Sequence, residues 1–153
     1  MRLLICIIVC QLAGVIGALS MRASVSTWYS ALIKPFFNPP SWVFAPAWTI
    51  LYTLMGVAAF IIWRKGLQLP EVRYALLVFS IQLILNMIWT PAFFGLRSPL
   101  AGFIVIIMLW IAILITILSF YSVSRAAAIL LIPYIIWVSF AAVLNGSILY
   151  LNR

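Results

Sequence analysis

Five long runs without a charged residue divide the sequence and restrict what the chain can fold into. They cover residues 3–21, 35–63, 74–96, 98–124 and 126–152, and each is at least 19 residues long. A helix that crosses a lipid bilayer needs roughly 20 consecutive, predominantly apolar residues. The runs therefore predict five membrane-spanning helices, at about residues 3–21, 43–63, 73–94, 99–120 and 126–150.

The composition also favours a membrane protein. Hydrophobic residues make up 68% of the chain and charged residues only 7%, whereas roughly a quarter of the residues in a soluble domain are charged. Strands of a membrane β-barrel would alternate polar and apolar residues over segments of about 10 residues, and these runs do not alternate. We therefore expect an all-α integral membrane protein, a single five-helix bundle formed by residues 1–153.

The first run has some features of a signal peptide. Arg2 provides a basic start, and Ala18-Leu19-Ser20 loosely fits a cleavage site with small residues. The run is longer than the hydrophobic region of a signal peptide, which is typically about 7–15 residues. We interpret it as a retained helix, with cleavage as the alternative.

The charge distribution argues against a nucleic-acid-binding protein. The formal net charge is +8 because Glu71 is the only acidic residue, and the basic residues are scattered along the chain. A nucleic-acid interface needs a clustered basic face, so contact with anionic lipid headgroups is the better interpretation. Five spans would place five basic residues at one end of the bundle and four at the other, which leaves the orientation in the membrane open.

The residues that the chain lacks argue against several classes of protein. There is no histidine, and no charged residue falls inside a predicted span, whereas proton-coupled transporters usually carry such groups there. The chain lacks the residues that catalysis by a Ser-His-Asp triad or by paired carboxylates requires. Cys6 and Cys10 share one face of the first helix, but two ligands do not complete a metal site, so we expect them to pack as small apolar residues. We predict no metal site and no required cofactor.

The connection between the first two spans, residues 22–42, is predicted to be a long structured loop. It contains the stretch KPFFNPPSW (34–42). A connection of this length inside a compact domain is usually functional or disordered, and this one is too aromatic for disorder. Its prolines fix the backbone and remove N–H donors near the membrane. We expect a lid over the mouth of the bundle, with the lid residues Lys34, Pro35, Pro39 and Pro40.

Other prolines mark helix ends and irregularities. Ser98-Pro99 fits an N-cap followed by proline at the first helical position, and Ala45-Pro46 is expected to begin the second span in the same way. Pro91 and Pro133 lie inside or near the ends of the third and fifth spans. We expect both prolines to kink their helices, which membrane helices tolerate.

Three predicted spans each carry a stripe of aromatic and amide side chains. Residues three or four positions apart lie on one helical face. The stripes are Trp48, Tyr52 and Met55; Gln82, Asn86, Trp89 and Phe93; and Tyr134, Trp137, Ala141 and Asn145. If they face one another, they line an apolar, aromatic pocket with a few polar groups, which suits a large, flat, hydrophobic ligand.

A purely structural interpretation competes with the pocket. Buried amides often form hydrogen bonds between membrane helices, and tryptophans near helix ends form interfacial belts. Trp63 is expected in such a belt, and Trp110 is expected to face lipid or a neighbouring helix. The agreement of three stripes favours the pocket.

Three blocks of the sequence resemble a known family. They are WYSALIKPFFNPPSWVFAPAWTILYTLMG (28–56), QLILNMIWTPAFFG (82–95) and PYIIWVSFAAVLN (133–145). In content and order they are similar to the TspO/MBR family, which comprises the tryptophan-rich sensory proteins and the translocator proteins, or peripheral-type benzodiazepine receptors. The blocks cover more than a third of the chain, and its length and five spans fit the same family.

The resemblance implies a five-helix bundle, commonly a homodimer, that binds porphyrins such as protoporphyrin IX and haem, and also synthetic drug-like molecules. For bacterial members it implies roles in tetrapyrrole regulation or the stress response. Some of them promote light- and oxygen-dependent breakdown of protoporphyrin IX, and the tryptophans linked to this reaction correspond to Trp48 and Trp137. The drug contacts of the family correspond to Trp48, Trp89, Phe140, Ala141 and Leu144.

The stripes, the lid and the resemblance together give a set of candidate ligand-binding residues. They are Trp42, Trp48, Tyr52, Asn86, Trp89, Phe93, Tyr134, Trp137, Phe140, Ala141, Leu144 and Asn145. Trp42 is expected to pack against the ligand or the bundle. Lys34 is expected to pair with a porphyrin propionate, with a lipid headgroup contact as the alternative.

One position departs from the family. Animal members have a tyrosine directly after the asparagine that corresponds to Asn145, and this chain has Gly146 there. A cholesterol-type pattern survives at Leu144, Tyr150 and Arg153, but such patterns are weak. We do not predict specific cholesterol binding, and we expect a bacterial cell-envelope membrane rather than a mitochondrial outer membrane.

Three functional hypotheses follow from the sequence. The leading one is a membrane receptor or carrier for porphyrins and related flat hydrophobic ligands. The first alternative is an enzyme-like degradation of bound protoporphyrin IX by light and oxygen. The second is a small-molecule transporter or a scaffold, although small multidrug exporters rely on an intramembrane glutamate and this chain has none.

Overall fold

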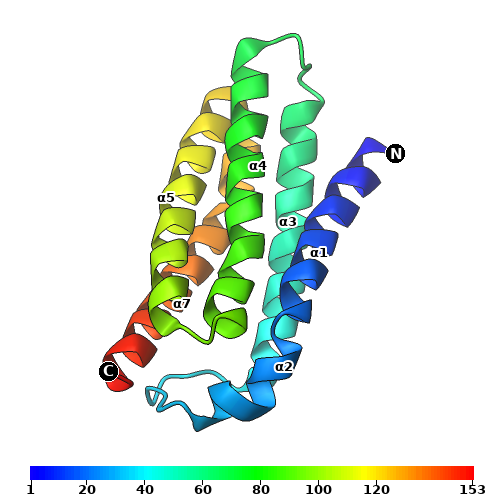
Figure 1. The fold of residues 1–153 in the computed structure, drawn as a ribbon. Helices are drawn as coiled ribbons and strands as arrows, with labels where there is room; N and C mark the ends of the chain where they lie inside the picture. The colour runs from blue at the N-terminus through cyan, green and yellow to red at the C-terminus, as the bar shows by residue number, and fades with distance from the viewer.

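The computed structural model describes all 153 residues and consists of helices joined by loops (Figure 1). Five helical stretches are long and apolar enough to cross a membrane: Arg2–Tyr29, Ser41–Trp63, Pro70–Gly95, Pro99–Val123 and Arg125–Leu151. These stretches confirm the prediction of an all-α protein with five spans.

The stretches are divided into shorter helical elements. They are α1 (Arg2–Leu19), α2 (Arg22–Ser24), η1 (Val25–Tyr29), η2 (Ser41–Val43), α3 (Phe44–Trp63), α4 (Pro70–Thr90), η3 (Pro91–Gly95), α5 (Pro99–Val123), α6 (Arg125–Leu130) and α7 (Ile132–Leu151). Two of them, η1 and η3, are π-helices, and η2 is a 3₁₀-helix. The α4 helix begins at Pro70 rather than at residue 73, because proline is well placed at the first helical position and Glu71 in the first turn suits the helix dipole.

The connection predicted as a loop over residues 22–42 is shorter in the structure, because residues 22–31 are helical. Hydrogen-bond and aromatic contacts hold this segment against η3. The hydroxyl of Ser24 donates a hydrogen bond to the carbonyl oxygen of Phe94 at 2.8 Å, and the Trp28 ring packs edge-on against Phe93 with ring centroids 5.5 Å apart. Within the connection between α1 and α3, only residues 32–40 lack regular helical structure, and they contain three of the prolines.

The predicted N-cap at Ser98 is confirmed, and the expected start of the second span is corrected. The Ser98 hydroxyl accepts a hydrogen bond from the N–H of Ala101, and Pro99 occupies the first turn of α5. In contrast, α3 begins at Phe44 after a 3₁₀ turn, and no side chain caps it. Pro46 therefore lies inside the first turn, where its missing N–H needs no partner.

Pro91 and Pro133 both interrupt regular α-helix. Pro91 has no N–H to donate to the preceding turn, and from there the chain continues as π-helix η3, in which the N–H of Leu96 donates to the Pro91 carbonyl at 2.9 Å. Pro133 follows the break at Leu131 that separates α6 from α7. The expected irregularities in the third and fifth spans are present.

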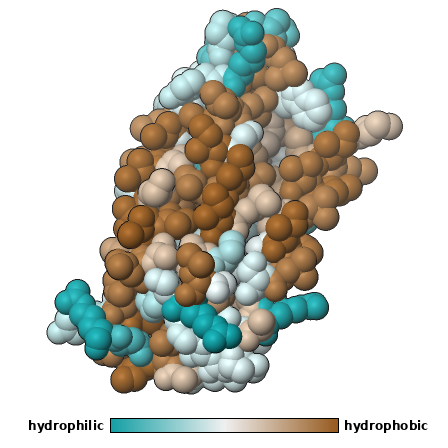
Figure 2. Space-filling model, in the orientation of Figure 1, coloured by the Kyte–Doolittle hydropathy of each residue, from teal (hydrophilic) through white to brown (hydrophobic).

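The five spans form a ring of packed helices. The α1 helix packs against α3 and α4, α4 packs against α5, α5 packs against α6 and α7, and α6 closes the ring on α3. The two termini lie at opposite ends of the bundle (Figure 1). Figure 2 shows a broad hydrophobic band over the side of the molecule and hydrophilic residues at its two ends. This distribution suits a chain whose sides contact lipid.

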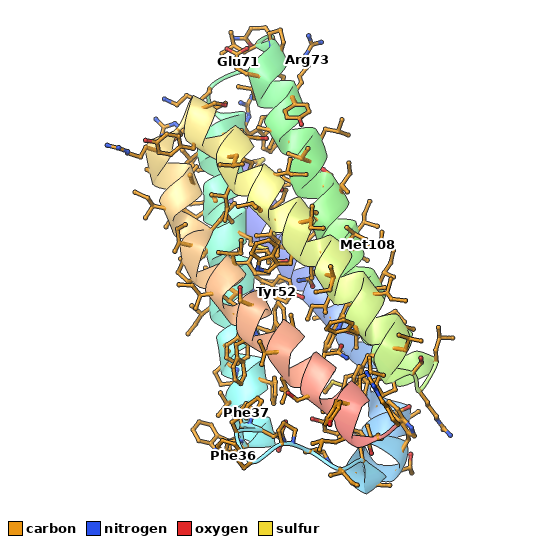
Figure 3. The ribbon with its side chains drawn as sticks, turned by 90° about the vertical axis from the view of Figure 1, so that its left-hand side faces the viewer. Phe36, Phe37, Tyr52, Glu71, Arg73 and Met108 are labelled. Carbon is orange, nitrogen blue, oxygen red and sulfur yellow. The ribbon has the colours of Figure 1, made fainter.

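The half of the bundle near the α3–α4 loop is filled by side chains. Met55, Ile62 and Ile113 are completely buried there, and Phe120 stacks on Phe79 with ring centroids 5.7 Å apart. Cys10 is also buried in this core cluster, as expected for a small apolar residue. In Figure 3, Tyr52 lies inside the bundle about halfway between the end with Glu71 and Arg73 and the end with Phe36 and Phe37. The half beyond Tyr52 is less completely filled.

The two tryptophans outside the stripes behave differently. Trp63 ends α3, and the guanidinium of Arg2 lies over its ring at 5.2 Å from the centroid, as fits a residue at the membrane boundary. Trp110 of α5 donates its indole N–H to the hydroxyl of Ser139 at 2.8 Å, so it faces a neighbouring helix rather than lipid.

The α1 and α3 helices approach each other closely at Gly56. A Cβ atom at this position would lie 2.6 Å from the Cα atom of Ile7, which is closer than real Cβ contacts. Helices in a membrane associate mainly through close packing, because lipid tails are as apolar as the side chains. The absence of a side chain at Gly56 is therefore a condition of this helix contact.

Replacing Gly56 by alanine should push α1 away from α3 and lower the free energy of unfolding by about 1–3 kcal/mol, the usual cost of overpacking. Gly95→Ala is the matched control, because a Cβ at Gly95 would meet only Pro91 Cβ at an ordinary 3.6 Å. Thermal unfolding of both variants in one detergent, followed by circular dichroism, measures the difference. Equal midpoints for Gly56→Ala and the unmodified protein would contradict the close approach.

Candidate ligand-binding cavity

A cavity of about 490 Å³ lies between the helices in the half of the bundle near the loop 32–40. Its walls come from α1, α3, α4, η3, α5 and α7, and residues of the connection between α1 and α3 cover its end. Nineteen of the 28 lining residues are hydrophobic, and none of the 28 carries a charge. The cavity has the usual size of a ligand site, roughly 300–1,000 Å³, and its lining favours an apolar ligand.

Aromatic rings from three helices form much of the wall. Trp48 stacks on Tyr52 with ring centroids 5.5 Å apart, and it meets Trp137 edge-on at 6.5 Å. On the α4 side, Trp89 stacks on Phe93 at 5.6 Å. The structure thus brings one tryptophan from each of the three sequence stripes to the same cavity.

A chain of hydrogen bonds closes the inner end of the cavity. The Tyr52 hydroxyl donates to Oδ1 of Asn86. Nδ2 of Asn86 donates to the Tyr134 hydroxyl at 2.8 Å, which donates in turn to Oε1 of Gln82 at 2.8 Å. Nε2 of Gln82 contacts the sulfur of Met55 at 3.8 Å. We call these five buried side chains the polar chain, and they join α3, α4 and α7 at one level.

A second amide holds the tryptophan of α4. The indole N–H of Trp89 donates to Oδ1 of Asn145 at 3.2 Å, and Nδ2 of Asn145 donates to the carbonyl oxygen of Pro99 at 2.9 Å. Asn145 therefore fixes the ring plane of Trp89 and ties α7 to the first turn of α5. The amides bond between helices, as the structural interpretation expected, and two of them, Asn86 and Asn145, also line the cavity.

Trp137 carries a polar atom without a partner. Its Nε1 is buried and makes no hydrogen bond within the chain. Buried donors are nearly always paired, and this residue lines the cavity. The indole N–H is thus available to an acceptor on a bound molecule.

Three of the twelve candidate ligand-binding residues do not line the cavity. Trp42 is 74% exposed on η2, and Phe44 instead packs against Trp137, with ring centroids 6.0 Å apart. Tyr134 belongs to the polar chain. Phe140 lies beside Trp137, with ring centroids 5.6 Å apart, and supports its ring without lining the cavity.

The lid residues are divided between two faces of the loop. Pro39 lines the cavity together with Asn38. Lys34 and Pro35 instead line a separate hollow on the outer surface of the bundle, and Pro40 is exposed. The Lys34 ammonium donates to the Leu32 carbonyl at 3.2 Å and lies 4.7 Å from the centroid of the Tyr29 ring. Its position therefore does not favour the expected pairing with a porphyrin propionate at the mouth of the cavity.

The sequence analysis missed the contribution of α1. Nε2 of Gln11 donates to the Thr49 carbonyl and to the Thr53 hydroxyl, both at 3.0 Å, and Gln11 lines the cavity. Gly14 lies against Tyr52, since a Cβ there would be 2.8 Å from Cδ2 of the ring. Gln11 is the one amide in the first uncharged run. This polar residue is the sequence signal from which the contribution of α1 to the cavity wall could have been predicted.

The mouth of the cavity faces sideways. Among its lining residues, the exposed ones all belong to α1 or to the start of the second span: Val15, Ala18, Ser41, Ala45 and Thr49. Most of these side chains are small. We call this opening between α1 and α3 the lateral mouth, and it lies in the side of the bundle that contacts lipid in a bilayer.

Comparison with known proteins gives a consistent result. The model described as the TspO/MBR family matches residues 6–151. The chain is 45% identical to the "Tryptophan-rich protein TspO" of Chlorobaculum tepidum over 152 residues, which is 99% of this chain and 96% of that protein. It is also 45% identical to the protein of the same name from Archaeoglobus fulgidus, covering 91% of this chain and 89% of that one. Identity to the "Translocator protein" of Ovis aries is 37%, covering 86% and 79%.

Replacing Tyr134 by phenylalanine should lower the free energy of unfolding by about 1–3 kcal/mol, because Asn86 and Gln82 would each lose a buried partner. Tyr150→Phe is the control, since Tyr150 is 69% exposed at the end of α7 and should change stability by less than about 0.5 kcal/mol. Thermal unfolding in detergent measures both. The same unfolding midpoint for the two variants would contradict the proposed contribution of the polar chain to stability.

Proposed function

Because the chain belongs to the TspO/MBR family, we propose that it is a membrane receptor or carrier that binds porphyrins, such as protoporphyrin IX and haem, in the cavity between its helices. Its five spans make it a multi-pass membrane protein. A bacterial cell-envelope membrane is the proposed location, because a bacterial and an archaeal relative are each 45% identical and the ovine one is 37% identical.

One observation carries this proposal: the cavity has an aromatic and uncharged lining. Trp48, Trp89 and Trp137 offer indole rings from three helices. Aromatic rings attract one another in offset-stacked or edge-on arrangements, so a porphyrin macrocycle suits this lining better than an aliphatic ligand does. The cavity contains no acid or base for proton transfer, which favours binding over acid–base catalysis.

The charged groups of a porphyrin limit how it can enter. No lysine or arginine lines the cavity, and a carboxylate buried without a partner is very unfavourable. The propionates therefore remain at the end of the cavity near Met21, which lines it and is followed by the exposed Arg22. The macrocycle alone occupies the aromatic part. The unpaired indole N–H of Trp137 suits a carbonyl of a synthetic drug-like ligand.

A second candidate function is light- and oxygen-dependent degradation of bound protoporphyrin IX. The adjacent rings of Trp48 and Trp137, 6.5 Å apart at the cavity wall, favour it, because indole is an easily oxidised side chain. Transport and scaffolding have no comparable feature in their support. We also propose that the protein acts as a homodimer in tetrapyrrole regulation or the stress response.

The Trp48→Ala and Trp137→Ala variants should each bind protoporphyrin IX about tenfold more weakly, since losing about 1.4 kcal/mol of stacking and burial is a tenfold change. Titration of the purified protein in detergent, followed by quenching of tryptophan fluorescence, gives the dissociation constants. Trp42→Ala is the control, because Trp42 is exposed and outside the cavity. Unchanged constants in both cavity variants would contradict the proposed site.

Illumination of the protein–porphyrin complex in air tests the second function. If degradation occurs, a new absorbing product should form with the unmodified protein and with Trp42→Ala, and about tenfold more slowly with Trp48→Phe, whose ring is harder to oxidise but still packs. Absorption spectra recorded against time measure the rate. Bleaching at the rate observed in detergent alone would leave binding as the only function of the cavity.

A further inference from the structure

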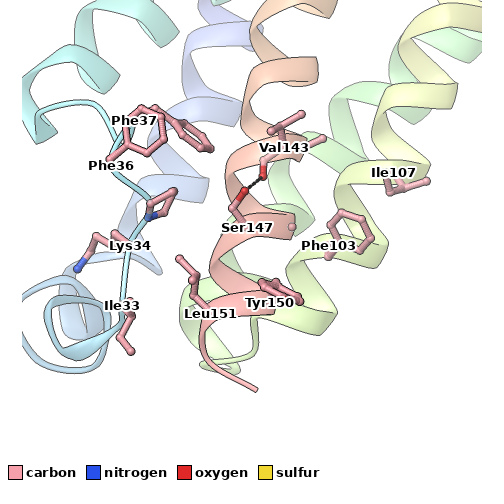
Figure 4. A pocket seen from close by; sticks show the side chains of 13 residues that line it. Ile33, Lys34, Phe36, Phe37, Phe103, Ile107, Val143, Ser147, Tyr150 and Leu151 are labelled. Carbon is pink, nitrogen blue, oxygen red and sulfur yellow. Dashed lines mark hydrogen bonds between the residues drawn. The ribbon is translucent and has the colours of Figure 1, made fainter.

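A second hollow lies on the outside of the bundle and is separate from the cavity. It is formed by residues 33–37, the first turns of α5 and the last turns of α7, and its volume is about 830 Å³. Figure 4 shows its lining, with Phe103 and Ile107 on one side, Val143, Ser147 and Tyr150 of α7 behind, and Lys34 on the side of the loop. We call it the outer groove. It is an open trough rather than an enclosed pocket.

The apolar part of the outer groove lies along the sides of α5 and α7. Val143 is 60% exposed and Ile107 is 40% exposed, so both contact lipid tails in a bilayer. Gly146 brings the two helices close, because a Cβ there would already lie 3.1 Å from the Phe103 ring. This part of the groove matches a long aliphatic chain running along the helices.

The loop side of the groove is fixed in place by the end of α7. Oδ1 of Asn152 accepts the N–H of Ile33 at 3.0 Å, and Nδ2 of Asn152 donates to the Ile33 carbonyl at 2.8 Å. This paired contact holds the backbone next to Lys34 against the C-terminal turn. The groove is therefore a preformed feature and does not depend on a ligand to order it.

The end of the groove that reaches the surface of the bundle is cationic. Lys34 is one of its lining residues, although its ammonium points away from α7 (Figure 4) and lies over the Tyr29 ring. The guanidinium of Arg153 lies 5.3 Å from the centroid of the Tyr150 ring, which also lines the groove. The chain has one acidic residue, Glu71, and it lies at the opposite end of the bundle (Figure 3). No acidic side chain is near this end, so a partner with a negatively charged group suits it.

We propose that the outer groove binds an anionic phospholipid, with an acyl chain along Phe103, Ile107 and Val143. Its phosphate pairs with Arg153 and with Lys34, whose flexible side chain turns from the Tyr29 ring to reach it. A molecule with an apolar tail and an anionic head matches both parts of the groove, and a bilayer presents such molecules at this depth. A sterol would satisfy only the apolar part. A second copy of the chain in the same orientation would place its own cations against these, which is unfavourable.

The lipid site is independent of the proposed porphyrin site, and native mass spectrometry of the detergent-solubilised protein tests it. The protein is titrated with phosphatidylglycerol and with phosphatidylcholine that carries identical acyl chains. The first lipid should bind about tenfold more tightly. Lys34→Gln and Arg153→Gln should each weaken its binding about fivefold, whereas Arg22→Gln, at the same end but outside the groove, should not.

Two tryptophan substitutions on α7 test the acyl-chain part. Val143→Trp fills the groove and should abolish the preferred site for phosphatidylglycerol. Ile136→Trp is the matched control, because Ile136 is 63% exposed on the same face two turns away and does not line the groove. If Val143→Trp does not fold, the Lys34→Gln titration still decides the question.

Several results would overturn this proposal. Equal binding of the two phospholipids, or full competition by cholesterol, would make the groove a site for any apolar molecule. Unchanged phosphatidylglycerol binding in both Lys34→Gln and Arg153→Gln would place the phosphate elsewhere. Loss of a dimer on Val143→Trp, read in the same spectra, would make the groove an interface between copies of the chain.

Discussion

A polar side chain inside a bilayer has no water to bond to, so its partner has to come from the protein. The polar chain meets this requirement with side chains from α3, α4 and α7, and it joins the three helices at one level. On one side of that level the core is filled by residues such as Met55 and Ile113. On the other side, the large indoles keep the helices apart and a cavity remains. The polar chain therefore fixes how deep a ligand can go.

Much of the fold could be predicted from the sequence because the thickness of the bilayer sets the length of each membrane span. Spans need about 20 apolar residues, and the nine basic residues mark where such runs end. The ends of the helices were harder to predict. Residues 22–31 are helical, and Ser24 and Trp28 contact η3, which is distant from them in the sequence. No local pattern encodes those contacts.

The cavity could be predicted only in part, for similar reasons. Spacing identified Trp48, Trp89 and Trp137 as inward-facing residues, but it could not separate Tyr134, which lies on the same face one turn deeper and belongs to the polar chain. Trp42 follows a loop whose conformation has no periodicity to use. Val15 and Ala18 could not be identified as lining residues from the sequence. Residues that face lipid and residues that face the cavity are both apolar, so composition does not distinguish the two faces of α1.

The lateral mouth between α1 and α3 has a consequence for how affinity is defined. A hydrophobic ligand that enters through it comes from the hydrocarbon phase, so occupancy depends on the amount of ligand dissolved in the lipid rather than in the water. The apparent aqueous dissociation constant is then the intrinsic constant divided by the partition coefficient of the ligand. Compounds with identical contacts to the cavity will rank by their solubility in the bilayer, and adding more lipid at fixed total ligand will empty the site by dilution.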